Sequence, residues 1–293
     1  MVERGSIVRL PGGYFDERGQ LHDEVVLAPL SGRDEEALLA AALPAAAVTS
    51  VLAQTIQRIG TIDRIDDAVV RELLIADRQV LLLELRERTF GPRITGSCVC
   101  ERAGCGQRIS LSFAIQDLAV RVLADKQPAY ACALPPDDLA GDRERWVTVR
   151  LPNGGDQEAV CEAVVAGGSG AQALRILVER CLIAPGPGLT ADQLAPADLL
   201  AIERFLVDTA PAVDLAVCAR CPECQSEVTV ELDVQDFFFG ELVTGAAKLY
   251  QDVHDLAVHY HWSEQDILAL SKPKRARYLG LIADAMEAAD AGG

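Results

Sequence analysis

Apolar residues recur at the spacing of helices over much of the chain. Residues 67–90 show the pattern best, since apolar side chains follow one another until Gly91-Pro92, a pair typical of a helix end. Ser31 and Ser263 are each followed by an aspartate three residues later, which is typical of a capped helix start. The pattern predicts helices over 34–42, 45–59, 67–90, 169–182, 196–208, 236–259, 264–270 and 274–289.

Apolar and polar positions alternate in two segments that also repeat each other. Residues 105–118 align with residues 224–237 without a gap, and each copy begins with a cysteine and continues as an alternating strand. Two such copies can pair as the halves of one zinc ribbon. A repeat of this length can also arise by chance, so it supports the zinc ribbon without establishing it. The apolar positions 109, 111, 113 and 115 fall on 228, 230, 232 and 234.

Two further stretches predict β structure. Short apolar runs separated by Pro11-Gly12-Gly13 and by a turn at 16–19 predict a β arm within residues 1–30. Apolar runs on both sides of Pro152-Asn153-Gly154-Gly155 predict a hairpin over 146–161.

Six of the nine cysteines form two clusters. They are Cys98, Cys100 and Cys105, then Cys218, Cys221 and Cys224. A structural zinc ion takes four soft ligands in a tetrahedron, and cysteine pairs two to four residues apart on a tight turn supply two ligands each. Four thiolates leave no open coordination position, so such a metal would stabilise the fold and would not catalyse a reaction.

The internal repeat selects the four ligands. Because it aligns Cys105 with Cys224, we expect the pairs Cys100/Cys105 and Cys221/Cys224 to bind one Zn²⁺. Cys98 and Cys218 do not correspond across the repeat and are interpreted as buried thiols or spare ligands. The alternative is six thiols without a metal. Three single cysteines in apolar surroundings are interpreted as core residues: Cys132, Cys161 and Cys181.

These elements predict an α+β protein that is mostly α. It would have a helical body, a split zinc ribbon made of two cysteine knuckles with β-hairpins, and an inserted mixed subdomain. The expected divisions are an N-terminal β arm, a helical region, the first ribbon half, the inserted mixed α/β segment, the second ribbon half and a C-terminal helical region. Their boundaries are 1–30, 31–92, 93–118, 119–210, 211–235 and 236–293.

Composition narrows the possible partners. The formal charge of −17 repels phosphate backbones and anionic lipid, so neither nucleic acid nor a membrane surface is expected. The most apolar run, 37–48, is interrupted by Pro44 and is shorter than the roughly 20 residues of a membrane span. No signal peptide is visible at the start of the sequence, which favours a cytoplasmic protein. In a reducing compartment, nine cysteines favour metal binding or buried thiols over disulfides.

No motif for a reaction is recognisable. The sequence has no phosphate-binding loop, dinucleotide fingerprint or nucleophile elbow, so we expect neither enzymatic activity nor a small-molecule substrate. His254, His259 and His261 lack the spacing of a metalloprotease and are interpreted as helix-surface or interface residues. One basic cluster is interpreted as a solvated helix face or a docking patch: Lys272, Lys274, Arg275 and Arg277.

Several segments resemble baseplate proteins of contractile-tailed phages and of the related contractile injection systems of bacteria. The most specific is 259–270 (HYHWSEQDILAL). Others are Cys221-Pro-Glu-Cys224, 232–238 (LDVQDFF), 58–60 (RIG), 73–78 (LLIADR) and the stretch from Leu82 to Phe90. The chain departs from the family pattern in lacking a proline after Cys100 and in carrying the extra Cys98.

The resemblance implies a baseplate component or a factor that assembles the baseplate hub. Its partners would be other tail proteins such as hub, spike, tube or wedge subunits, and the protein would remain cytoplasmic or be incorporated into a particle. Two other functions compete with this one. The first is a cytoplasmic zinc-ribbon adaptor or regulator that binds protein or nucleic acid, and the second is a metal hydrolase.

Overall fold

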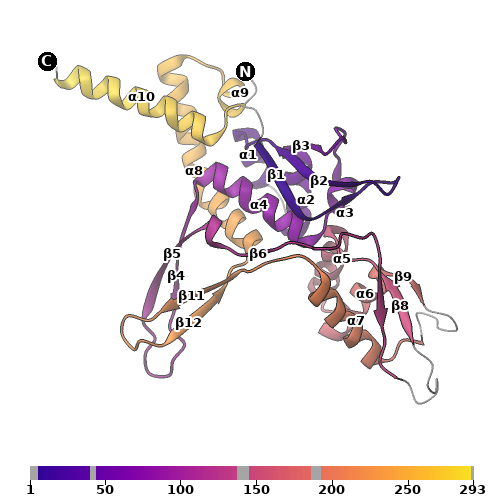
Figure 1. Cartoon of the computed structure of the whole chain (residues 1–293). Coiled ribbons are helices and arrows are strands. Elements are labelled where there is room, and N and C mark those ends of the chain that lie inside the picture. The colour runs from indigo at the N-terminus through magenta and orange to yellow at the C-terminus, as the bar shows by residue number, and fades with distance from the viewer. Residues whose placement is uncertain (1–5, 40–43, 137–144, 186–192, 292–293) are drawn as a thin grey trace.

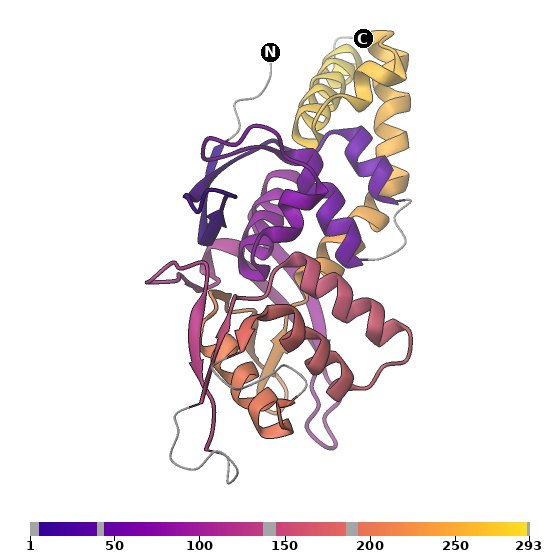
Figure 2. The ribbon, with the colours of Figure 1, turned by 90° about the vertical axis from the view of Figure 1, so that its right-hand side faces the viewer.

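The computed structural model describes residues 6–39, 44–136, 145–185 and 193–291. It is a mixed α/β protein, with about half of its residues in helices and a quarter in strands. Figure 1 shows a central body, two long hairpins below it, a second group of helices and strands to one side, and a helical arm that carries the C-terminal end. Figure 2 shows the arm and the body from the side.

A three-stranded antiparallel sheet and four helices form the body. The sheet order is β1 (Ser6–Phe15), β2 (Leu21–Leu27) and β3 (Ile56–Ile59). The predicted N-terminal arm is therefore part of a sheet, because the end of the predicted 45–59 helix pairs with β2 as a strand. The helices are α1 (Gly32–Leu39), α2 (Pro44–Thr55), α3 (Asp67–Glu72) and α4 (Ile75–Phe90). Residues 1–5 and 40–42 of the predicted elements lie outside the described residues.

Pro11-Gly12-Gly13 is an irregular part of β1 and does not separate two strands as predicted. The register of β1 against β2 shifts between Arg9 and Tyr14. The Gly12 N–H donates to Asp77 Oδ1 at 2.7 Å, and a Cβ at Gly12 would lie 2.4 Å from a methyl of Leu74. Burial raises the pKa of Asp77 to about 7. The glycine thus allows the strand to approach α4 closely.

The predicted 67–90 helix is broken in the structure. Leu73 and Leu74 adopt extended backbone angles, so α3 ends and α4 begins anew. The Leu73 carbonyl accepts from the Gly154 N–H at 3.0 Å, and Leu74 forms a bridge with Asn153. A contact 80 residues away in sequence therefore interrupts the apolar pattern.

The predicted hairpin at 146–161 is wrong. Only β8 (Trp146–Val149) is a strand, and it pairs with β7 (Tyr130–Ala133) and β9 (Leu182–Pro185). Asn153 instead caps α5 (Gly154–Val165) by accepting from the Asp156 N–H. Helices α6 (Gly170–Cys181) and α7 (Pro196–Thr209) cover this sheet, and a separate apolar core lies between them. Residues 137–144 and 186–192 of this segment lie outside the described residues.

A buried polar network joins this segment to the body. Arg78 is 2% exposed and donates to Thr49 Oγ1 at 2.9 Å. The Thr49 hydroxyl donates to Glu158 on α5, and Arg71 Nε donates to the same carboxylate at 2.8 Å. A Cβ at Gly154 would lie 1.8 Å from Arg78 Nη1, so only glycine fits there. The network thereby sets the position of α5 against α2, α3 and α4.

The C-terminal region is helical as predicted. It comprises α8 (Val234–Tyr260), α9 (Glu264–Leu268) and α10 (Lys272–Ala291). The base of α8 packs on α4, where Phe238 is fully buried and Arg86 donates two hydrogen bonds to Glu241 at 2.8 and 2.9 Å. Ser263 caps α9 by accepting from the Asp266 N–H at 3.2 Å, which confirms the predicted helix start.

Arg275 does not belong to a solvated basic face. It is 1% exposed and donates to Glu35 on α1 at 2.7 Å, while its Nε lies 3.8 Å from Asp252 on α8. The Arg275 guanidinium also donates to the Leu270 carbonyl at 2.8 Å. Lys272 lies over the Phe90 ring, 4.0 Å from its centroid. Two of the four predicted basic residues therefore fasten α10 to the body.

Within 6–39, 44–136, 145–185 and 193–291, no helix combines the length and the apolar character that a membrane crossing requires.

We predict that Arg275→Leu lowers the free energy of unfolding by about 3–5 kcal/mol, because it leaves the carboxylate of Glu35 buried without its cation. Arg9→Leu is the matched control. Arg9 forms an exposed pair with Glu24, at 3.5 Å, and its loss should cost less than about 1 kcal/mol. Urea unfolding followed by circular dichroism measures both variants. Equal costs for the two substitutions would contradict a structural role for the buried pair.

Candidate metal centre

Two hairpins project from the body and meet at their loops (Figure 1). One consists of β4 (Arg93–Val99) and β5 (Arg108–Ala114), and it follows α4. The other consists of β11 (Ala216–Arg220) and β12 (Glu227–Glu231), and it precedes α8. The first hairpin continues into η1 (Ile115–Asp117) and β6 (Val120–Arg121), and β6 pairs with β10 (Ala212–Val213). The hairpins therefore stand side by side although residues 115–215 separate them in the chain.

The loops of the two hairpins have the same hydrogen bonds around their cysteines. The Cys100 N–H donates to the Gln107 carbonyl at 2.8 Å, and the Cys221 N–H donates to the Ser226 carbonyl at 2.9 Å. The second cysteine of each loop accepts from the backbone two residues later, at Gln107 and Ser226 respectively. Cys100 is thus equivalent to Cys221, and Cys105 to Cys224.

The two loops reach this equivalence with different lengths. The first holds four residues between its cysteines and the second holds two. The backbone of the longer loop turns at Gly104 and Gly106, which have φ of 82° and 62°. This left-handed region is open to glycine at little cost. In the shorter loop the same region is occupied by Gln225, with φ of 59°.

The four equivalent thiols converge on one point. All four Sγ atoms lie within 4.8 Å of one another. The nearest pairs join the two hairpins, with Cys100 to Cys224 at 3.6 Å and Cys105 to Cys221 at 3.7 Å. A tetrahedral site with metal–sulfur bonds of about 2.3 Å has edges of roughly 3.8 Å, whereas a disulfide requires about 2.05 Å. The spacing fits a shared metal ion and excludes a disulfide in this conformation.

The apolar surface around the thiols is small. Cys100, Cys221 and Ile109 are buried, and the side chains that pack against them are only partly covered: Cys98, Cys105, Leu111, Ala219, Cys224 and Val228. Hairpins with so few apolar side chains between them do not bury enough surface to stay together in water. A metal that binds all four thiols would supply the missing free energy.

Ser226 lies between two of the sulfurs. Its Oγ is 2.9 Å from Cys224 Sγ and 3.4 Å from Cys100 Sγ. Hydrogen bonds from the Ser226 hydroxyl and backbone lower the pKa of Cys224 to about 6. This favours a thiolate, the form that binds metal.

Cys105 shows the opposite electrostatic effect. The Gln107 N–H acts to lower its pKa, but burial and the thiols of Cys224, Cys221 and Cys100 outweigh that and raise it to about 12. Four adjacent negative charges repel one another unless a cation lies between them. Metal binding must therefore displace protons, and affinity should fall as the pH is lowered.

The remaining cysteines lie outside the cluster. Cys98 packs beside it on β4, and Cys218 on β11 is exposed, with its Sγ 3.5 Å from Thr229 Oγ1. Cys132 and Cys181 are buried as predicted, whereas Cys161 is exposed, so its assignment to the core was wrong. The four predicted ligands are thus the four thiols that the structure brings together.

Sequence reasoning missed two residues beside the thiols. They are Ser226, described above, and Arg102, whose guanidinium donates to the Cys224 carbonyl at 3.2 Å. Ser226 could have been found, because it occupies the same place as Gln107 in the internal repeat. Arg102 lies in the other hairpin, so its contact depends on how the two loops meet.

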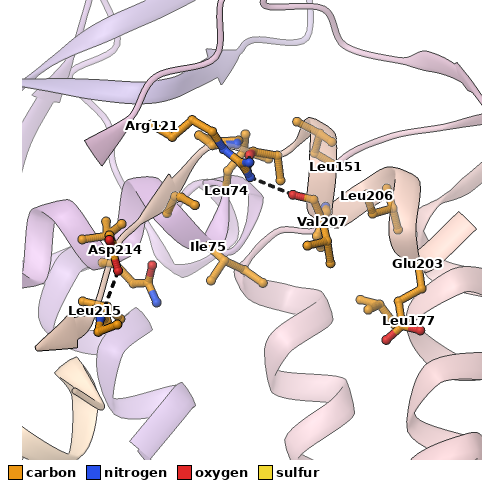
Figure 3. Close-up of a pocket in the computed structure, with 18 of the residues that line it drawn as sticks. Leu74, Ile75, Arg121, Leu151, Leu177, Glu203, Leu206, Val207, Asp214 and Leu215 are labelled. Carbon is orange, nitrogen blue, oxygen red and sulfur yellow. Dashed lines mark hydrogen bonds between the residues drawn. The ribbon is translucent and has the colours of Figure 1, made fainter. Parts of the chain in front are cut away.

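A cavity among the described residues lies away from the cysteines. It has a volume of about 490 Å³ and separates α4 from α6 and α7, with β10 along one side (Figure 3). Arg121 crosses it and donates to the carbonyls of Val207 and Ala210, both at 2.7 Å. Most of its lining is apolar, including Leu74, Leu177 and Leu206. The cavity marks where the inserted segment meets the body.

We predict that Ser226→Ala weakens metal binding by about 10- to 100-fold, since it removes the hydroxyl that contacts two ligand sulfurs. Competition with a chromophoric chelator measures the affinity. Ser110→Ala on β5 is the control, because Ser110 is an exposed serine of the other hairpin, and it should leave the affinity unchanged. If Ser226→Ala had no larger effect than Ser110→Ala, Ser226 would have no role in supporting the ligands.

Comparison of the chain with protein-family models, with curated proteins and with solved structures finds no match.

Proposed function

We propose that the four thiols bind one structural Zn²⁺ and that the two hairpins form a split zinc ribbon. The convergence of Cys100, Cys105, Cys221 and Cys224 carries this proposal. Four thiolates in a tetrahedron are typical ligands of structural zinc, which has no preference for another geometry. Soft sulfur ligands disfavour Mg²⁺ and Ca²⁺, which prefer oxygen.

The zinc would close a long loop of the chain. The ligands of one hairpin lie more than 110 residues from those of the other, and the whole inserted segment lies between them. Structural zinc in small peptides contributes about 10–16 kcal/mol of apparent binding free energy. Such a contribution far exceeds what the few apolar side chains around the site can provide.

We predict one zinc ion per chain and its loss in Cys221→Ser. The variant should also unfold at a lower temperature, since the hairpins lose the ligand set that joins them. Elemental analysis and thermal unfolding measure the two effects. Cys218→Ser is the matched control, because Cys218 lies three residues earlier, on β11, with its side chain outside the cluster.

The control should keep its zinc and its unfolding temperature. Wild-type protein that is fully folded and free of metal would contradict the proposal. If Cys218→Ser lost zinc as readily as Cys221→Ser, the ligand set would be wrong.

We further propose that the protein is a non-enzymatic component or assembly factor of a contractile tail or injection-system baseplate. The sequence resemblance supports this, above all through 259–270. That segment packs against α1, where Gly32 N donates to the Leu270 carbonyl at 3.1 Å and Arg33 donates to the Gln265 carbonyl at 3.0 Å. It therefore has a structural role that would be shared by proteins of the same fold.

Other segments of the resemblance also occupy positions where the fold restricts the residue type. Gly60 has φ of 54°, and a Cβ there would lie 2.3 Å from the His22 ring. Asp77 binds the irregular part of β1, and Arg78 belongs to the network that joins the body to α5. Proteins that share this fold would need the same residue types at these positions. The resemblance at Gly60, Asp77 and Arg78 therefore supports a structural function.

Deletion of the gene in the organism that encodes this chain tests the baseplate proposal. We expect the strain to lose complete contractile particles, as judged by electron microscopy, and a plasmid copy to restore them. Peptide mass spectrometry of purified wild-type particles separates the two roles, since a component is present in them and an assembly factor is absent. Two results together would refute both roles, whatever the zinc content: the deletion strain makes normal particles, and the particles of the wild type do not contain the protein.

A further inference from the structure

Two hollows lie next to each other at the C-terminal end of α7. One is the cavity of about 490 Å³ described above, and the other has a volume of about 280 Å³. Arg121 and Ala210 line both of them, so the two hollows form one groove, which we call the α7 groove. Ligand sites commonly have volumes of about 300–1,000 Å³, so this groove is large enough to hold several side chains of a partner.

The α7 groove presents apolar side chains to solvent. Val122 and Val207 line it and are 59% and 63% exposed. Leu74, Ile75 and Leu177 also line it and are only partly buried. Apolar side chains gathered around one hollow are typical of a surface that binds another molecule.

The charged residues that line the α7 groove are acidic, with the exception of Arg121. The carboxylates are those of Asp125, Glu203, Asp208, Asp214 and Glu231. Within the part of the chain that the structure describes, no lysine, arginine or histidine forms an ion pair with any of the five, whereas Asp198 and Glu241 each pair with an arginine. The groove therefore carries negative charge that the chain itself does not neutralise.

Arg121 does not offset these carboxylates, because its guanidinium is held by the end of α7. It donates to the carbonyls of Val207 and Ala210, both at 2.7 Å. Carbonyls at the end of a helix lack partners within the helix and attract a cation. Figure 3 shows Asp214 and Glu203 on opposite sides of Ile75. Negative charge thus lies on both sides of the apolar surface.

We propose that the α7 groove binds a segment of another protein in which apolar side chains are flanked by lysines or arginines. The apolar side chains of this segment cover Val122 and Val207, and its cations pair with the carboxylates on both sides. An acidic partner would place like charges against each other, and phosphate groups of nucleic acid or lipid would be repelled in the same way. The proposal depends on neither the zinc site nor the baseplate.

Selection of peptides from a random 16-residue library displayed on phage, with the full chain as the target, tests the proposal. We expect the selected peptides to combine leucine or isoleucine with flanking lysine or arginine. Fluorescence anisotropy of the labelled peptides then measures their Kd for the chain and for its variants. A selection without any peptide of Kd below about 100 µM would overturn the proposal, and so would selected peptides without basic residues.

The double variant Glu203→Gln/Glu231→Gln tests the charge of the groove. It should weaken binding of the selected peptides by about tenfold, because two exposed ion pairs are lost. Glu17→Gln/Glu162→Gln is the matched control. Glu17 and Glu162 are exposed, do not line the groove and, when replaced, change the net charge by the same amount. The control should bind the peptides as the wild type does.

Val207→Asn tests the apolar surface. It should weaken binding by about five- to tenfold, because it replaces an exposed apolar side chain that the segment would cover. Val165→Asn is the control, since Val165 is 76% exposed at the end of α5 and does not line the groove. Circular dichroism checks that all variants remain folded. If the groove variants bound the peptides no more weakly than their controls, the peptides would use another surface and the proposal would be wrong.

Discussion

The arrangement of the hairpins depends on two cysteine loops that are far apart in the sequence and lie together in space. Cys100 and Cys105 end one hairpin, Cys221 and Cys224 end the other, and all four sulfurs lie within 4.8 Å of one another. The hairpins leave the body at α4 and return to it at α8, and these two helices pack against each other. The base of the hairpins is therefore fixed by the body. Only a few apolar side chains join their tips, where the four thiols could hold a metal ion.

In the rest of the molecule, buried arginines join segments that are far apart in the sequence. Arg78 contacts the network at α5, Arg86 pairs with Glu241 on α8, and Arg275 pairs with Glu35 on α1. Each guanidinium joins segments that are far apart in sequence. Buried ion pairs of this kind often add little net stability compared with apolar packing, but an unpaired charge at the same place is costly. They therefore penalise any arrangement in which the helices are misplaced.

The C-terminal arm differs from the body in the exposure of its apolar side chains. Arg275 and the packed rings of Tyr260, Trp262 and Tyr278 fix the first half of α10. Beyond them, Leu281 and Met286 are 52% and 57% exposed. The same helix thus contains a buried anchor and an exposed surface. A protein that works through contacts with other chains, as proposed for this one, needs such a rigid and accessible element.

The sequence alone was sufficient for what depends on local spacing. Helix periodicity, the serine caps of α1 and α9 and the two cysteine loops are encoded within short windows, and the ungapped repeat was enough to select the four clustered thiols. Distant contacts decided the rest. The Leu73 carbonyl and the bridge at Leu74 break a continuous helical pattern, the end of a predicted helix becomes β3 against β2, and Asn153 caps a helix where the sequence favoured a hairpin. The sequence predicted a surface cation at Arg275, but in the structure its guanidinium donates to Glu35, 240 residues away. No local pattern records such a partner, because the free energy of a buried charge depends on what the fold places next to it.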